Sequence, residues 1–416
     1  MNILAFNPGS ATLKFALYAM DASTPAVAGA NEQHAAVRAL VTGVVERIGT
    51  PDSTFTMSAG PRDSANKPAY VSDSAHAVEE VIARLKALHS GDKAMPLTIE
   101  AVGCRVVHGG AALVNPALIT PSVLDEMRAL KDLAPLHVPT DIAVIESVQR
   151  LLPGIPVIAV FDTAFHHTIP EVARTYALPA DLCVRHGLRR YGFHGISHSY
   201  VSRQFLKLAK RDARGTRIIT CHLGNGSSLC AVRDGQSVDT SMGFTPMEGL
   251  MMGTRSGDLD PGVILYLMRT VGMTAADLDE LLNRQSGLRG VSALSADVRD
   301  LEQEALNGNT RAALALSMFA YRARKYIGAY AAVLEGVQAI VFTGGIGEHS
   351  PSMRRGICHG MEFLGVHLDA DRNDAATGSV AQLVSTDASA VAIWVIPTDE
   401  GREIAQDTFV ALRSAQ

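Results

Sequence analysis

Two glycine-rich segments of the sequence have the composition of phosphate-binding turns. One covers residues 7–14 (Asn-Pro-Gly-Ser-Ala-Thr-Leu-Lys) and the other residues 222–228 (His-Leu-Gly-Asn-Gly-Ser-Ser), and each joins two apolar runs. Backbone N–H groups and small hydroxyls at such turns can surround phosphate oxygens without steric obstruction. Each segment alone is also typical of an ordinary tight turn, but the two together, with Lys14 ending the first, favour a polyphosphate ligand.

A third glycine-rich segment, residues 342–350 (Phe-Thr-Gly-Gly-Ile-Gly-Glu-His-Ser), follows an apolar run and precedes Arg354 and Arg355. This order has the outline of a strand-to-helix nucleotide loop. The chain has no Gly-Lys pair and no completed G-x-G-x-x-G pattern, which are signatures of P-loop kinases and of dinucleotide-binding dehydrogenases. The sequence therefore disfavours both classes.

Two arginines and two carboxylates stand where a ligand could reach them. Arg105 and Arg255 lie in glycine-containing segments, and a guanidinium can bind a carboxylate or phosphate with two parallel hydrogen bonds. A surface ion pair is the alternative for each arginine. Asp162 and Glu400 each come just after a predicted strand, at the edge where an open α/β sheet carries its chemistry.

Histidines are concentrated in three short segments, which contain His166, His167, His194, His198 and His222. The H-x-x-x-H spacing of His194 and His198 could ligate zinc from one face of a helix. Gly192 and Gly195 would weaken such a helix, and no H-E-x-x-H motif is present. A histidine that stabilises a developing phosphoryl charge is the other interpretation.

Short apolar runs alternate with helical patterns along the chain. The runs predict buried strands at 3–6, 101–107, 156–161, 217–223, 339–342 and 391–396. Helices are predicted at 77–88, 122–130, 142–152, 310–334 and 401–412. This alternation predicts an α/β fold, and the polar stretches 49–74 and 369–389 are interpreted as surface hairpins or loops. A strand, a Gly-Ser loop and a second strand occur twice, at 3–15 and 219–231, which is either a trace of duplication or a coincidence between two common hairpins.

The composition limits the class of protein. With 416 residues, two domains are expected. The formal charge of −5 and the lack of a basic run argue against a nucleic-acid partner. No apolar run reaches the roughly 18 residues of a membrane helix, and no signal peptide is evident. Five cysteines without C-x-x-C spacing argue against a disulfide framework, so a cytoplasmic location is expected.

Several ordered segments of the sequence resemble those of the acetate kinase family, and the resemblance extends from end to end of the chain. The segments that carry it are 7–14, 105–110, 133–137, 161–166, 189–195, 222–228, 239–258 and 343–348. The resemblance implies two ribonuclease-H-like domains of the actin/Hsp70/sugar-kinase-like type, with an active-site cleft between them. Residues 1–165 with 400–416 would form the first domain, and residues 166–399 the second, nucleotide-binding domain.

The resemblance also implies roles for individual residues. The catalytic residues would be Arg105, Asp162, His194 and Arg255. The substrate would contact Arg105, Val107, Leu136, Phe193 and Pro246, of which the four apolar residues would otherwise be read as core. The nucleotide would contact Ser10, Thr12, Lys14, His222, Leu223, Gly224, Asn225, Gly226, Asp297, Val298, Arg299, Gly344, Gly345, Ile346 and Gly347. Asn7 and Glu400 would bind Mg²⁺, with Mn²⁺ as the alternative metal.

The implied reaction is reversible, Mg²⁺-dependent phosphoryl transfer from ATP to acetate, which gives acetyl phosphate and ADP by direct in-line transfer. Such a transfer needs positioning and cations around the phosphoryl oxygens, which these residue types supply. A homodimer is also implied. Val138 and Ile196 depart from the family pattern near the substrate segments, so a propionate or butyrate kinase is the alternative enzyme. An ATP-driven binding protein of the same fold is the alternative from another class.

Overall fold

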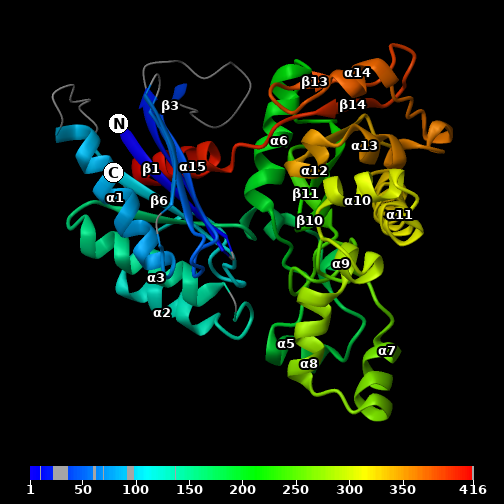
Figure 1. Cartoon of the computed structure of the whole chain (residues 1–416), viewed down its shortest axis with the longest axis horizontal. Coiled ribbons are helices and arrows are strands. Elements are labelled where there is room, and N and C mark those ends of the chain that lie inside the picture. The colour runs from blue at the N-terminus through cyan, green and yellow to red at the C-terminus, as the bar shows by residue number, and fades with distance from the viewer. Residues whose placement is uncertain are drawn as a thin grey trace. The chain divides into compact units, whose positions relative to one another are not determined.

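The computed structural model describes residues 1–9, 11–21, 36–59, 62–68, 70–90, 98–135 and 137–414, with residues 62–68 and 89–90 described by their backbone alone. The chain forms two compact units, each built around one sheet (Figure 1). Unit 1 consists of Met1–Ala164 and Asp399–Gln416, and unit 2 of Phe165–Thr398. No helix in the described part of the chain has the length and apolar character of a membrane span.

The sheet of unit 1 has the strand order β5-β4-β3-β2-β1-β6-β8-β7. Its strands are β1 (Asn2–Pro8), β2 (Thr12–Asp21), β3 (Ala36–Glu46), β4 (Thr54–Ala59), β5 (Arg62–Pro68), β6 (Ala101–Val106), β7 (Ala117–Leu118) and β8 (Val157–Phe161). Strands β1, β6 and β8 are parallel, whereas β2 to β5 continue the sheet in antiparallel pairs. The central residues of these parallel strands are apolar because helices cover both faces of this part of the sheet, whereas the polar residues Asn7 and Arg105 lie toward the carboxyl ends.

Side chains of these strands alternate between two layers of helices. Leu4 and Phe6 of β1 belong to the core formed with α1 (Ser74–Ser90) and α3 (Val138–Leu151), and α2 (Pro121–Ala129) packs on α3. The C-terminal helix α15 (Glu400–Ser414) packs on β1 and β6. A Cβ atom on Gly103 of β6 would lie only 2.2 Å from Thr408 Oγ1 of α15, so this helix needs a glycine beneath it.

The sheet of unit 2 has the strand order β11-β10-β9-β12-β14-β13. Its strands are β9 (Arg217–Leu223), β10 (Ser227–Arg233), β11 (Gln236–Thr240), β12 (Ala339–Thr343), β13 (Gln382–Leu383) and β14 (Ala392–Val395). Alternate side chains again face two layers. Ile218 and Val341 pack with α6 (Gly195–Leu208), whereas Ile219 and Phe342 pack with the long helix α11 (Thr310–Val333).

Shorter helices complete unit 2. They are α4 (Glu171–Arg174), α5 (Ala180–His186), α7 (Pro261–Tyr266), α8 (Ala275–Glu280), α9 (Gly287–Ser292), α10 (Val298–Leu306), α12 (Gly344–His349), α13 (Pro351–Cys358) and α14 (Ala370–Ala375), with 3₁₀ turns at Ala164–Thr168 and Glu362–Leu364 and π-helical turns at Leu267–Val271 and Leu281–Gln285.

Five strands of each sheet follow the same order and directions. These are β3-β2-β1-β6-β8 in unit 1 and β11-β10-β9-β12-β14 in unit 2. In unit 1, β1, β2 and β3 form an antiparallel meander, and β6 and β8 run parallel to β1. In unit 2, β9, β10 and β11 form the same meander, and β12 and β14 run parallel to β9. The predicted α/β fold of two ribonuclease-H-like domains is therefore confirmed. The two glycine-rich segments occupy equivalent positions, because residues 7–14 connect β1 to β2 and residues 222–228 connect β9 to β10.

Two local predictions need correction or refinement. Residues 369–389 are not only loop, because they contain α14 and β13. The third glycine-rich segment is not an open loop either, because α12 begins directly at Gly344. The stretch 49–74 does contain a surface hairpin, β4–β5, which extends the sheet.

Candidate active site

Arg105 and Asp162 form a buried ion pair in unit 1. Arg105 lies on β6, and Asp162 comes directly after β8, the parallel neighbour of β6. Arg105 Nη2 donates to Asp162 Oδ2 at 2.9 Å, and Nη1 donates to the Pro8 carbonyl at 2.8 Å. The two side chains are 14% and 1% exposed, respectively. The guanidinium is therefore held at the carboxyl ends of the strands, beside the first glycine-rich segment.

Arg105 keeps both its charge and an unused donor. Burial disfavours the charged guanidinium, but the attraction of Asp162 and Glu400 outweighs burial and raises the pKa of Arg105. Its buried Nε has no hydrogen-bond partner among the described residues. Because a buried donor without an acceptor is costly, this atom is suited to a carboxylate or phosphate oxygen of a ligand.

Asp141 supports the same strand end and was not among the residues predicted from the sequence. It lies on α3 with 2% of its surface exposed, and its carboxylate accepts a 2.8 Å hydrogen bond from the backbone N–H of Val107. Burial raises the pKa of Asp141 to about 7. A signal was available, because Asp141 interrupts the apolar stripe of Val138, Ile145 and Val148 at helical spacing.

Asn7 and Glu400 lie together in unit 1 and offer oxygen ligands. Asn7 ends β1 and Glu400 begins α15, and Asn7 Nδ2 donates to Glu400 Oε2 at 2.5 Å. This orientation leaves the amide oxygen and the second carboxylate oxygen for a cation. Mg²⁺ is usually held by one or two such protein groups together with water and substrate phosphates, so the donor set fits Mg²⁺ and also Mn²⁺.

The first glycine-rich segment turns the chain from β1 into β2. Lys14 stands directly opposite Asn7 in this antiparallel pair, so both side chains project from the same face of the sheet. Thr12 begins β2, and its carbonyl accepts from the N–H of Gly9 at 2.8 Å. The predicted site residue Ser10 lies outside the described residues.

His194, His222 and Arg255 come together around Gly226 in unit 2. The rings of His194 and His222 are stacked with centroids 4.3 Å apart. A Cβ atom on Gly226 would lie 3.4 Å from His194 Nε2 and 3.6 Å from Arg255 Nη1. His194 caps α6 with φ of +56°, a left-handed conformation that is costly for a residue other than glycine and that often marks functional positions. His194 and Arg255 therefore meet at the second glycine-rich segment, and His222 stacks on His194.

Arg255 is a partly buried cation whose hydrogen-bond partners are neutral. Its Nη1 donates to the Pro246 carbonyl at 2.9 Å and contacts Met252 Sδ at 3.7 Å. Burial lowers the pKa of Arg255, and no carboxylate pairs with it in the described part of the chain. A positive charge that is partly shielded from water and has no counter-charge is a suitable site for an anionic ligand.

The predicted acyl pocket is divided between the two units. Val107 lies in unit 1 and is 4% exposed, and Phe193 lies in unit 2 and is 2% exposed. Pro246 is partly buried in unit 2, where its carbonyl holds Arg255. Leu136 falls outside the described residues. The four-residue pocket thus stays a prediction.

Two glycine-rich segments pack on each other in unit 2. Gly344 begins α12 with φ of +74°, and a Cβ atom there would lie 2.7 Å from the Leu223 carbonyl oxygen. Next to it, a Cβ atom on Gly345 would meet nothing within 4 Å. The structure therefore places residues 223–226 next to residues 344–347 at the carboxyl ends of β9 and β12. Ile346 belongs to the second of these two segments.

Asp297, Val298 and Arg299 begin α10. Asp297 caps this helix by accepting the N–H of Arg299 at 2.9 Å, and the Arg299 side chain pairs with Asp297 at 2.6 Å while remaining 87% exposed. This bonding holds the pKa of Asp297 below its usual range. Val298 is buried. The polar contacts of Asp297 and Arg299 are local, whereas Val298 packs in the core of unit 2. The predicted role of this segment toward a nucleotide stays a prediction.

Glu348 and Arg354 hold the third glycine-rich segment in place by hydrogen bonds to its backbone. Glu348 Oε1 accepts from Thr343 Oγ1, from the N–H of Gly344 at 2.8 Å and from the N–H of Thr398 at 3.0 Å. Arg354 is fully buried, and its Nη1 donates to the carbonyls of Gly347 and Glu348, each at 2.9 Å. Arg354 therefore holds the backbone of α12, and its guanidinium nitrogens all donate to groups of the protein itself.

His194 and His198 share one serine as a hydrogen-bond partner. His194 Nδ1 and His198 Nε2 both bond to the Ser228 hydroxyl, at 2.9 and 2.8 Å. No group of three or more His, Cys, Asp or Glu side chains is arranged to hold a metal within the residues that the structure describes. The phosphoryl-stabilising interpretation of His194 stays a prediction.

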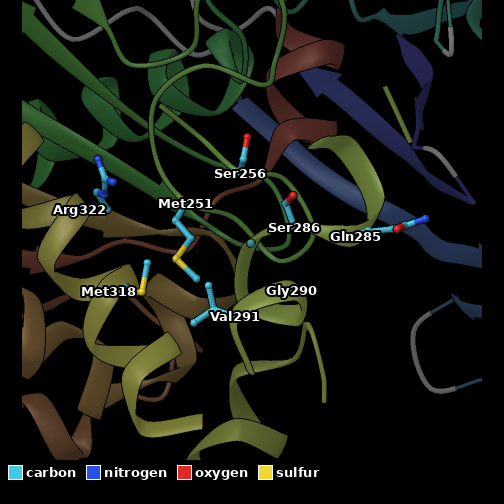
Figure 2. Close-up of a pocket in the computed structure, with 9 residues that line it drawn as sticks. Met251, Ser256, Gln285, Ser286, Gly290, Val291, Met318 and Arg322 are labelled. Carbon is cyan, nitrogen blue, oxygen red and sulfur yellow. The ribbon is translucent and has the colours of Figure 1, made fainter. Parts of the chain in front are cut away.

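A pocket of about 370 Å³ opens near the Arg255 segment but contains none of the predicted site residues (Figure 2). Met251, Val291 and Met318 line one part of it, and Ser256 and Ser286 line another. Its lining offers no titratable group apart from Arg322. This pocket therefore adds no residue to the predicted site.

The sequence profile of the Acetokinase family matches residues 2–406. The chain belongs to the acetokinase family. An acetate kinase of Heliobacterium modesticaldum is 45% identical over 413 residues, which cover 99% of this chain and 100% of the relative. The crystal structure of an acetate kinase from Porphyromonas gingivalis covers 99% of both chains with a TM-score of 0.85 at 41% identity. A propionate kinase from Francisella tularensis covers 98% of this chain and 99% of its own, with a TM-score of 0.86 at 36% identity.

Membership in the acetokinase family confirms the resemblance found in the sequence. The match is continuous across both units, so it includes every segment in which a site residue was predicted. The structure adds contacts that the family name alone does not give, above all the Arg105–Asp162 pair and the grouping of His194 with Arg255.

Proposed function

We propose that this acetokinase family member catalyses the reversible transfer of the γ-phosphoryl group of ATP to acetate, which gives acetyl phosphate and ADP. The observation that carries the proposal is Arg255. It is a partly buried cation that pairs with neutral groups and with no carboxylate among the described residues, it lies beside His194, and the segment containing it falls within the family match.

Phosphoryl transfer depends on positioning and on stabilising the charge of the transferred group. We assign this work to the Arg105 and Arg255 guanidinium groups and to the His194 ring, which would donate to the oxygens of the carboxylate and of the phosphoryl group. Asp162 holds Arg105 in place by the 2.9 Å ion pair. None of these groups has to form a covalent bond with substrate, so direct in-line transfer is the proposed course.

We assign a divalent cation, Mg²⁺ or Mn²⁺, to Asn7 and Glu400. When bound with ATP, such an ion supplies positive charge that neutralises the phosphates. The residues themselves are held without it, since Asn7 Nδ2 donates to Glu400 and Asp399 Oδ1 closes the first turn of α15 by accepting the N–H of Arg402 at 2.9 Å.

We further propose that unit 2 is the nucleotide-binding domain. The packing of Gly344 against Leu223 supports this assignment, because two glycine-rich backbone segments then present N–H groups at the same sheet edge. Thr12, Lys14 and Ser10 of the first glycine-rich segment are proposed to contact phosphate as well. His222, Gly224, Asn225, Asp297 and Arg299 complete the proposed nucleotide set.

A homodimer in the cytoplasm is the proposed state of the protein. Six large apolar residues around α7 are exposed, namely Leu259, Val263, Leu265, Tyr266, Met268 and Val271. A contiguous group of this kind is typical of an interface, and we assign a second copy of the chain to it. All five cysteines are free, as a reducing compartment requires.

The test is a hydroxamate assay of the purified protein with ATP, Mg²⁺ and acetate, propionate or butyrate, run beside Arg255→Ala. We expect acetyl hydroxamate as the preferred product, with turnover lowered at least about 100-fold in the variant because a charge-stabilising donor is lost. Preference for propionate would keep the mechanism and change the substrate, since one methylene is worth about 1–3 kcal/mol. No product with any acid would favour an ATP-driven binding protein.

A further inference from the structure

A buried chain of hydrogen bonds runs from β9 to His194. Thr220 Oγ1 bonds to His198 Nδ1 at 2.7 Å, His198 Nε2 bonds to Ser228 Oγ at 2.8 Å, and Ser228 Oγ bonds to His194 Nδ1 at 2.9 Å. Three different elements contribute, because Thr220 lies on β9, Ser228 on β10, and His198 on α6 one turn after His194.

The inner members of this chain are shut off from water. Thr220, His198 and Ser228 are each 0% exposed, so their polar atoms depend on one another. His194 at the end of the chain is partly exposed. Its Nδ1 faces Ser228, whereas its Nε2 lies toward Gly226, near Arg255 Nη1. The buried chain thus ends on the ring edge opposite the one assigned to the phosphoryl group.

The single hydroxyl proton of Ser228 links the states of the two histidines. A neutral imidazole carries one N–H, so His194 can donate from Nε2 only if its Nδ1 accepts a proton from Ser228. The Ser228 oxygen then accepts from His198 Nε2–H, and His198 Nδ1 accepts from Thr220. The opposite direction of bonding would aim a lone pair of a neutral His194 at the anionic phosphoryl group, which is repulsive.

We propose that His198 and Ser228 are positioning residues that hold His194 as the tautomer with its proton on Nε2. The inference deepens the proposed function and rests on it, because it assigns a task to two side chains outside the predicted site. The same arrangement explains how the ring keeps one orientation although the His194 backbone is in the left-handed region.

The first test compares His198→Leu, His198→Gln and Ser228→Ala in the full-length protein. Gln carries an amide N–H at the same distance from Cα as His Nε2 and can still donate to Ser228, whereas Leu cannot. We expect kcat to fall about 10- to 100-fold in His198→Leu and Ser228→Ala, as is usual for residues that orient a functional group, with KM for ATP little changed. His198→Gln should recover most of the loss.

A double variant separates positioning from a general loss of packing. Because His198 acts through Ser228, His198→Leu in the Ser228→Ala background should cost less than about 3-fold more, rather than a second full factor. Ser202→Ala is the matched control. Its hydroxyl is buried on the same helix and donates to the His198 carbonyl at 2.6 Å, so it can affect stability but should leave kcat unchanged.

The second test observes the tautomer directly. In protein labelled with ¹⁵N-histidine, the His194 ring, identified by its loss in His194→Gln, should show the proton on Nε2, and Ser228→Ala should shift it toward a mixture of tautomers. A proton on Nδ1 of neutral His194, multiplicative kcat losses in the double variant, or normal kcat in His198→Leu would overturn the inference. If the unaltered protein forms no acyl hydroxamate, the proposed function fails, and the tautomer then decides this inference alone.

Discussion

The two arginines of the candidate site are held in opposite electrostatic ways. Arg105 is paired with Asp162 at 2.9 Å, and this pairing raises its pKa, whereas the pKa of Arg255 is lowered by burial because its partners are neutral. A ligand carboxylate or phosphate therefore competes with Asp162 for Arg105 but finds Arg255 without a counter-charge.

The raised pKa of buried Asp141 should make the protein less stable as pH rises from about 4 to 7. Its pKa is raised to about 7 in the folded protein, compared with about 3.9 in an unfolded chain. Between these values the folded state binds the extra proton, so this carboxyl lowers the free energy of unfolding as pH rises, by at most about 4 kcal/mol. Buried His108, whose pKa is lowered to about 4, acts in the opposite direction up to about pH 6.5.

Asp141→Asn removes one of these opposing effects. The amide can still accept from the Val107 N–H, so relative to the unaltered protein the variant should gain stability progressively from about pH 4 to 7 and hold the gain above pH 7. Urea denaturation at several pH values measures this difference. A difference that does not vary with pH would show that the pKa of Asp141 is the same in the folded and unfolded states.

Single residues of the site differed in how far sequence could predict them. Arg105, Asp162, His194 and Arg255 belong to segments with recognisable spacing, although no observation yet tests their roles. Ser228 could be named only as part of a glycine-serine turn, because its partners His194 and His198 lie 34 and 30 residues away. Such a contact depends on the packing of α6 against the sheet, which local pattern does not specify.

The elements that carry the site were more predictable than their ends. Apolar runs identified β1, β6, β8, β9, β12 and β14, because parallel strands buried on both faces leave a continuous apolar signal. The helix α12 was missed since glycine disfavours helix. In the protein, the bonds of Glu348 to Thr343, Gly344 and Thr398 hold its first turn, and these tertiary contacts override local propensity.

Adjacent glycines of α12 provide a matched test of this element. Gly344→Ala would place a Cβ atom 2.7 Å from the Leu223 carbonyl oxygen at a φ of +74°, so strain and overpacking should together cost about 2–4 kcal/mol. Gly345→Ala meets nothing within 4 Å and should leave thermal stability unchanged. Calorimetry of both variants measures the costs, and equal melting temperatures would contradict the packing of α12 on β9.

Displacement of α12 should also affect the nucleotide. The Gly344→Ala variant should show a higher KM for ATP than the unaltered protein, because the N-terminal turn of α12 is the proposed phosphate contact. The KM for acetate should change much less. A normal KM for ATP in a measurably destabilised variant would remove the third glycine-rich segment from the proposed nucleotide site.

At the scale of the whole molecule, the two units are assembled differently. Unit 2 is one continuous stretch, Phe165–Thr398, whereas unit 1 needs α15 from the far end of the chain. In α15, Ile404 and Phe409 are buried, and the helix packs on β1, β2, β6 and β8. Unit 1 is therefore complete only when α15, which begins with Glu400, packs on its sheet.

A chain ending at Thr398 should separate the two units thermodynamically. Without α15, one face of the unit 1 sheet is uncovered, so we expect the calorimetric transition of unit 1 to disappear while that of unit 2 remains. If unit 2 binds the nucleotide, ATP at 100 times its Kd should stabilise the remaining transition by about 2.7 kcal/mol. The continuous fragment 165–398 is the matched control and should respond to ATP in the same way. A truncated chain whose transition is insensitive to ATP, although the full-length protein responds, would assign nucleotide binding to residues outside unit 2.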